Sequence, residues 1–131
     1  PLLGTAGTCI VGGIIWGVWH APLTVHGHNF GTDYPGFPYV GIGLMCLLCT
    51  FEGMILLWLT KKTGSIYPAA VMHAVGNNGG VGLGQLLVSG IGEYEEFQFM
   101  PKHYFVMLIP YVILGITFLV LMLRDRKKQN V

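Results

Sequence analysis

The sequence predicts an all-α fold, a polytopic bundle of transmembrane helices that forms a single membrane-embedded domain over residues 1–131. Only 10% of the residues are charged and 53% are hydrophobic, whereas soluble domains carry roughly 25% charged residues. The charged residues are also clustered, and long apolar stretches separate the clusters. A membrane-crossing helix needs about 20 apolar residues, so we expect about four spans, over roughly residues 8–23, 37–60, 65–90 and 104–123.

The first span carries small residues and a proline that shape its packing and its end. Gly13 and Gly17 stand four residues apart, which permits another helix to approach closely. Pro22 is expected to bend or end the helix just past His20, because proline disrupts helical hydrogen bonding. The following segment, 24–38, is rich in Gly, Pro and aromatic residues. It predicts an ordered loop.

The second span contains Glu52 near its middle. An ionisable side chain at that depth costs at least about 2.5 kcal/mol on insertion scales, so it should face protein or water. One interpretation is a protonated carboxyl group that hydrogen-bonds a neighbouring helix. The other is a supporting role at a polar site. The isolated position of Glu52 in the sequence favours the first.

The third span follows a tight connection at residues 61–64. Ser65 is a candidate N-cap, and Pro68 is tolerated because it falls in the first helical turn. Three glycines of this span recur at four-residue intervals, namely Gly76, Gly80 and Gly84. This doubled GxxxG pattern is expected to let another helix pack closely.

The connection 91–103 and the C-terminal tail hold most of the remaining charge. The three glutamates of the connection predict a solvated acidic loop rather than a catalytic or metal cluster. They are Glu93, Glu95 and Glu96. If the spans alternate in direction, all of the seven Lys and Arg residues except Lys102 fall on one side of the membrane. The positive-inside rule then predicts a cytoplasmic C-terminus.

Charge and cysteine content exclude other classes of protein. A net charge of +1 gives no electrostatic footprint for nucleic acid. The three cysteines, Cys9, Cys46 and Cys49, all lie in apolar runs. They are expected to be small buried hydrophobes, because a disulfide framework or a zinc site would need more partners.

Two histidines and an amide form the candidate site. His73 and Asn77 stand four residues apart in an apolar stretch, so on a helix they share one face. His20 lies in equally apolar surroundings. Because lipid supplies no hydrogen bonds, we expect all three to converge on one polar site. Imidazoles can bind a metal or activate water, and an amide can stabilise an oxyanion. The alternative is two unrelated histidines that satisfy separate buried hydrogen bonds.

The amino-acid sequences of three segments resemble those of a known family. They are IWGVWHAPL at residues 15–23, TGSIYP at 63–68 and HAVGNN at 73–78. Together with the loop at 29–38, they resemble the CPBP family of intramembrane proteases. This family comprises the type II CAAX prenyl endopeptidases and the bacteriocin-processing and immunity proteins of the Abi group.

The resemblance implies a role for each site residue. His20 matches the histidine of the family's Phe/Trp-x-x-x-His motif, and His73 and Asn77 match its His-x-x-x-Asn motif. In the family pattern a glutamate and the histidines activate a water, and the Asn stabilises the oxyanion. His20 and His73 would be the ligands if a zinc ion takes part. The family's Glu-Glu-x-x-x-Arg motif has no match in this sequence, so we expect the C-terminal part of a longer protease, inactive alone.

The leading functional hypothesis is therefore an endopeptidase in a bacterial cell membrane. It would be surrounded by lipid and would cleave membrane-proximal bonds in peptides or membrane proteins, with no nucleic-acid partner. The alternative is a non-catalytic membrane scaffold or a bacteriocin self-immunity protein that acts by binding. A third hypothesis is an ion or proton pathway through Glu52 and the histidines, which would require Glu52 to face an aqueous cavity.

Overall fold

The computed structural model describes residues 2–78 and 101–129, and over these residues it is entirely helical and loop, without strands. The helices are α1 (Gly4–Trp19), α2 (Ala21–Thr24), α3 (Tyr39–Thr63), α4 (Tyr67–Asn78) and α6 (Pro101–Gln129). The predicted all-α class is confirmed. The glycines and glutamates predicted to form a packing motif and an acidic loop between residues 79 and 100 lie outside the described part of the chain.

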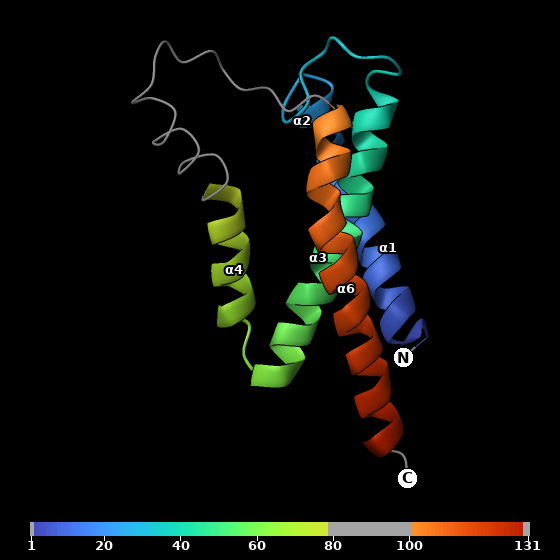
Figure 1. The fold of residues 1–131 in the computed structure, drawn as a ribbon, viewed down its shortest axis with the longest axis vertical. Coiled ribbons are helices and arrows are strands. Elements are labelled where there is room, and N and C mark those ends of the chain that lie inside the picture. Colours follow the sequence, from blue (N-terminus) through green and yellow to red (C-terminus); the bar gives the residue numbers. More distant parts are fainter. Residues whose placement is uncertain (1, 79–100, 130–131) are drawn as a thin grey trace.

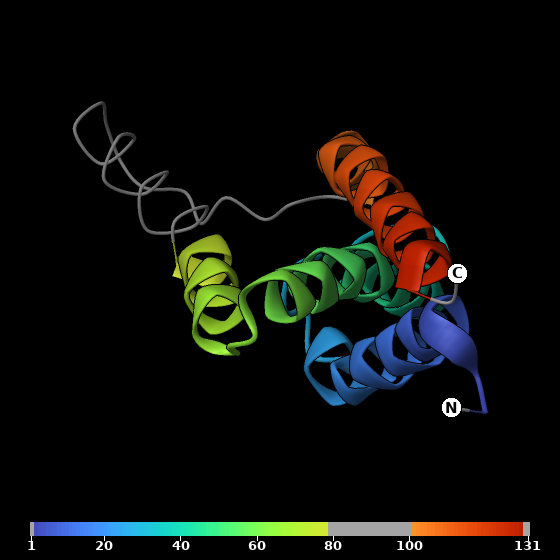
Figure 2. The same cartoon turned by 90° about the horizontal axis from the view of Figure 1, so that it is seen from below.

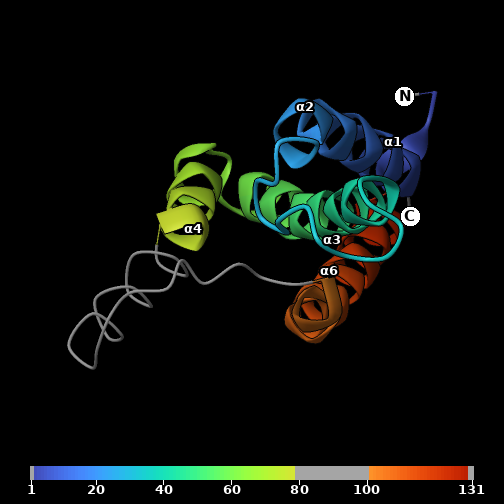
Figure 3. The same cartoon turned by 90° about the horizontal axis from the view of Figure 1, so that it is seen from above.

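Helix α3 is the element against which the others pack. It lies between α1 and α6, and α4 packs against a further side of it, as Figures 2 and 3 both show. Successive long helices run in alternating directions, so the two chain ends and the α3–α4 connection lie at one end of the molecule (Figure 1). This alternation agrees with the arrangement expected from the basic residues.

Two of the described helical segments are long and apolar enough to cross a membrane, namely Tyr39–Thr63 and Tyr104–Asp125. They correspond to the predicted second and last spans. Helix α1 is apolar but has only 16 residues, and the described part of α4 has 12. The total of about four spans therefore stays a prediction.

The contact between α1 and α3 depends on glycine. A Cβ atom at Gly13 would collide with the backbone of Thr50, and one at Gly17 would collide with the backbone of Cys46. The two helices thus approach at backbone distance along this seam, and the predicted close approach at the small residues is confirmed.

The helix ends follow the expected local chemistry. Helix α1 ends at Trp19, and His20 donates its backbone N–H to the carbonyls of the preceding turn. Gly64 has φ of 67° and ends α3 in the left-handed conformation that glycine adopts without strain. The Ser65 hydroxyl accepts a hydrogen bond from the backbone N–H of Tyr67, 3.2 Å away. Ser65 thus lies one residue before the N-cap position predicted for it, because the carbonyl of Ile66 accepts the first hydrogen bond of α4.

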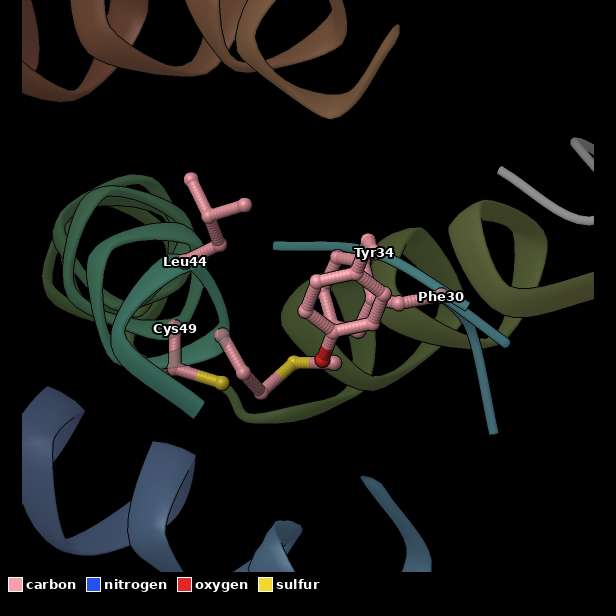
Figure 4. Packing of buried hydrophobic residues seen from close by; sticks show 5 residues of the cluster. Phe30, Tyr34, Leu44 and Cys49 are labelled. Atoms are coloured by element: carbon pink, nitrogen blue, oxygen red, sulfur yellow. The ribbon is translucent and has the colours of Figure 1, made fainter. Parts of the chain in front are cut away.

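The loop between α2 and α3 is packed against the helices. Phe30 and Tyr34 are buried beside Leu44 and Cys49 of α3 (Figure 4). The Phe30 ring also lies 4.4 Å, centroid to centroid, from Tyr104 of α6. The loop therefore covers one end of the bundle and packs against both α3 and α6.

A second apolar cluster holds the opposite end of the bundle together. Cys9, Met54 and Met122 are its buried members and come from α1, α3 and α6. Nearby, the Trp58 and Phe118 rings stack with centroids 4.2 Å apart. All three cysteines are free, and two of them are buried in these clusters, as expected for small hydrophobes.

Candidate functional site

His20 stands at the junction of α1 and α2, where α1 ends. Its Nδ1 lies 2.9 Å from the carbonyl oxygen of Trp16, one turn earlier. A carbonyl can only accept a hydrogen bond, so Nδ1 carries the proton and donates it. In the neutral ring this leaves a lone pair on Nε2, which can accept a proton or a metal ion.

His73 and Asn77 lie on one face of α4, as their spacing predicts. The side-chain amide nitrogen Nδ2 of Asn77 is 3.0 Å from Nε2 of His73. The amide group donates, so Nε2 of His73 also carries a lone pair in this arrangement. Both candidate site residues of α4 thus belong to one hydrogen-bonded unit.

Glu52 is the third member of this unit and comes from α3. It is only 8% exposed, and its Oε1 atom lies 2.9 Å from Nδ1 of His73. The expectation that Glu52 hydrogen-bonds a neighbouring helix is confirmed. The partner, however, is a candidate site histidine, a link that the sequence interpretation did not make.

A positional signal for this link exists in the sequence. Glu52 lies 12 residues before the tight connection at Gly64, and His73 lies nine residues after it. Two helices joined by a short connection run side by side in opposite directions. Polar residues on either side of such a connection, at comparable distances from it, are therefore candidates for direct contact.

Trp16 contacts both histidines. Its ring centroid is 5.1 Å from that of His73 in an edge-to-face arrangement and 6.2 Å from that of His20. Trp19 also packs against His20, with ring centroids 5.0 Å apart. Residues of α1, α3 and α4 therefore gather around one indole ring, which joins His20 to the unit formed by the other two helices.

The described residues do not by themselves form a zinc site. Catalytic zinc is typically held by three protein ligands and a water. Among residues 2–78 and 101–129, no group of three His, Cys, Asp or Glu side chains is placed to hold a metal ion. Nδ1 of His73 is also already bonded to Glu52. A zinc ion on His20 and His73 would need a further ligand from elsewhere.

The arrangement suits proton transfer. Each histidine is held through Nδ1 and has its lone pair on Nε2, and neutral imidazoles act as general bases near neutral pH. At His73 the Asn77 amide donates to Nε2, so it must turn away before this nitrogen can take a proton. The Asn77 amide carries a second N–H that can donate to a developing oxyanion. Side chains able to take a proton from water and to stabilise negative charge thus stand within one small region.

A family model for the type II CAAX prenyl endopeptidase Rce1-like family matches residues 2–79, more than half of the chain. The matched stretch contains every residue of the site described above. Comparison with curated proteins and with solved structures gives no match. Together with this family match, the two long apolar helices indicate that the protein is integral to the membrane. From this match, together with the motifs at His20 and His73, the chain belongs to the Rce1-like family of type II CAAX prenyl endopeptidases, within the CPBP group.

Proposed function

We propose that this protein is an intramembrane endopeptidase of the CAAX-protease type, which hydrolyses membrane-proximal peptide bonds in peptides or membrane proteins. The observation that carries the proposal is the placement of His73. Its ring is held between Glu52 and Asn77 and lies against the indole that also contacts His20. Polar groups in this number are costly inside a membrane span and mark functional sites.

The proposed reaction begins with a water held near Nε2 of His20, or near Nε2 of His73 once the Asn77 amide has turned from it to the carbonyl oxygen of the substrate. The imidazole takes a proton as the water oxygen attacks the peptide carbonyl. The Asn77 amide donates to the oxygen that becomes negative, which lowers the barrier. The proton then passes to the leaving amine. The family resemblance assigns a glutamate to this step as well, from a motif that residues 1–131 do not contain.

The proposal includes a location and an orientation. The protein would lie in a bacterial cell membrane with its C-terminus and the connection at residues 61–64 in the cytoplasm. The excess of basic residues at that end supports this orientation. Lipid would surround α3 and α6, and no nucleic acid would bind.

The test uses the full-length protein in membranes, with a fluorescent peptide substrate supplied in prenylated and unprenylated form. His20→Ala and His73→Ala should each lower cleavage by at least about 10²-fold, the usual contribution of a general acid–base group. His28→Ala is the matched control, because His28 is exposed in the loop after α2. It should cleave at the wild-type rate.

Equal membrane abundance of all variants excludes loss of folding as the cause. Wild-type cleavage by both His20→Ala and His73→Ala would contradict the proposal. A non-catalytic scaffold or immunity protein predicts a different result. Its protective effect would survive in His73→Ala and Asn77→Ala as long as the protein remains folded.

A further inference from the structure

Glu52 is placed where a carboxylate is most costly. It lies at the middle of α3, far from either end of a 25-residue helix, and its side chain is about one-tenth exposed. A buried ionisable group in a membrane span needs a compensating partner. The partner is Nδ1 of His73, at 2.9 Å, in an ion pair or a charge-assisted hydrogen bond between α3 and α4.

With Glu52 ionised and His73 neutral, the two hydrogen bonds of His73 permit only one arrangement of protons. A carboxylate can only accept, so Nδ1 donates to Oε1 of Glu52. Nε2 then has a lone pair, which matches the donor Nδ2 of Asn77 at 3.0 Å. In the other tautomer the Nδ1 lone pair would face the carboxylate oxygen. Turning the Asn77 amide around could repair the contact at Nε2 but not the contact at Nδ1.

We infer that Glu52 is a positioning residue: its carboxylate fixes His73 in the tautomer with the lone pair on Nε2 and sets the orientation of the ring. A carboxylate behind a functional histidine commonly has this effect. Among the described helices α4 packs against α3, so the bond also fixes the face of α4 that is presented to Trp16. The consequence for turnover rests on the proposed protease function, whereas the tautomer does not.

A purely structural role for Glu52 makes a different prediction from a positioning role. Glu52→Gln keeps the size of the side chain and can still hydrogen-bond Nδ1. The amide, however, can either accept a hydrogen bond from Nδ1–H through its oxygen or donate one to the Nδ1 lone pair through its nitrogen, so it permits both tautomers. If Glu52 only fills space and satisfies a partner, Glu52→Gln should leave the His73 tautomer unchanged. If Glu52 positions His73, the tautomer should no longer be fixed.

The primary experiment is nitrogen NMR of the full-length protein, with ¹⁵N-labelled histidine, in lipid nanodiscs. The His73 signals are assigned by their loss in His73→Asn. Wild type should show a protonated Nδ1 and an unprotonated Nε2. Glu52→Gln should show a mixture of tautomers or the reverse one. Asp33→Asn, which removes an exposed carboxylate in the loop, is the control and should match wild type.

The second experiment measures peptide cleavage by the full-length protein. Glu52→Gln should lower kcat by about 10–100-fold, the usual effect of removing such a partner, with KM unchanged. Glu52→Asp keeps a carboxylate and should restore the tautomer and part of kcat. A His73 ring protonated on Nε2 in wild type would overturn the inference. So would an unaltered tautomer in Glu52→Gln.

The two experiments separate this inference from the proposed function. If wild-type protein cleaves no peptide, the protease proposal fails and the NMR result still decides the role of Glu52. If cleavage depends on His73 while the Glu52→Gln tautomer is unchanged, the protease proposal stands and the positioning role is rejected.

Discussion

Trp16 is the side chain that contacts both histidines of the site. Its ring lies against both imidazoles, while its backbone carbonyl accepts a hydrogen bond from Nδ1–H of His20. Its side chain and its main chain therefore set the position of His20 and the distance between α1 and α4 at the site. The aromatic position in the family's Phe/Trp-x-x-x-His motif has a physical explanation in this packing.

We predict that Trp16→Phe retains peptide cleavage and that Trp16→Ala lowers it by about 10²-fold. Phenylalanine keeps an aromatic face between the imidazoles, whereas alanine leaves a gap into which both rings can shift. A misplacement of about 1 Å in a catalytic group can cost that factor. Steady-state cleavage by the full-length protein is the measurement. Equal rates for Trp16→Ala and Trp16→Phe would show that the ring has no part in positioning.

At the scale of the helices, the approach of α1 to α3 decides whether the site forms. Gly13 faces the backbone of Thr50 across this seam, whereas Gly12, its neighbour in sequence, has no atom within 4 Å of a Cβ position. The two glycines therefore provide a matched pair for the same chemical change.

We predict that Gly13→Ala destabilises the helix bundle by about 1–3 kcal/mol, the usual cost of an overpacked contact. The added methyl group meets backbone atoms of α3, which cannot move aside as a flexible side chain would. Gly12→Ala should leave stability unchanged. Unfolding in detergent micelles, followed by circular dichroism, measures the difference. The same unfolding midpoint for both variants would disprove the close approach of α1 and α3.

At the scale of the whole molecule, the long helices alternate in direction and place both chain ends with the α3–α4 connection (Figure 1). The loop from α2 to α3 closes the opposite end through Phe30 and Tyr34. Lys61 and the C-terminal end of α6, where the basic stretch 124–128 stands, therefore share one end of the bundle. This arrangement places most of the basic residues at one end of the bundle. The positive-inside rule associates such an end with the cytoplasm.

We predict that a reporter that is active only in the cytoplasm works when fused to the C-terminus of the full-length protein. The same reporter inserted beside Asp33, in the loop between α2 and α3, should be inactive. Replacing Lys61 and Lys62 with glutamine should weaken this orientation, because these residues contribute to the basic excess. Activity of the loop reporter and silence of the C-terminal one would reverse the proposed topology.

The sequence by itself determined the class of protein, the two longest spans, the end of α1 before Pro22, and the shared face of His73 and Asn77. Each of these depends on local quantities, namely apolar length, backbone chemistry and helical period. The tertiary structure alone decided that Glu52 forms a hydrogen bond with His73 and that the Trp16 ring contacts both His73 and His20. These contacts join separate helices, so they depend on how each helix is rotated about its axis. That rotation is set by glycine seams and aromatic packing between helices, which no periodicity within a single segment encodes.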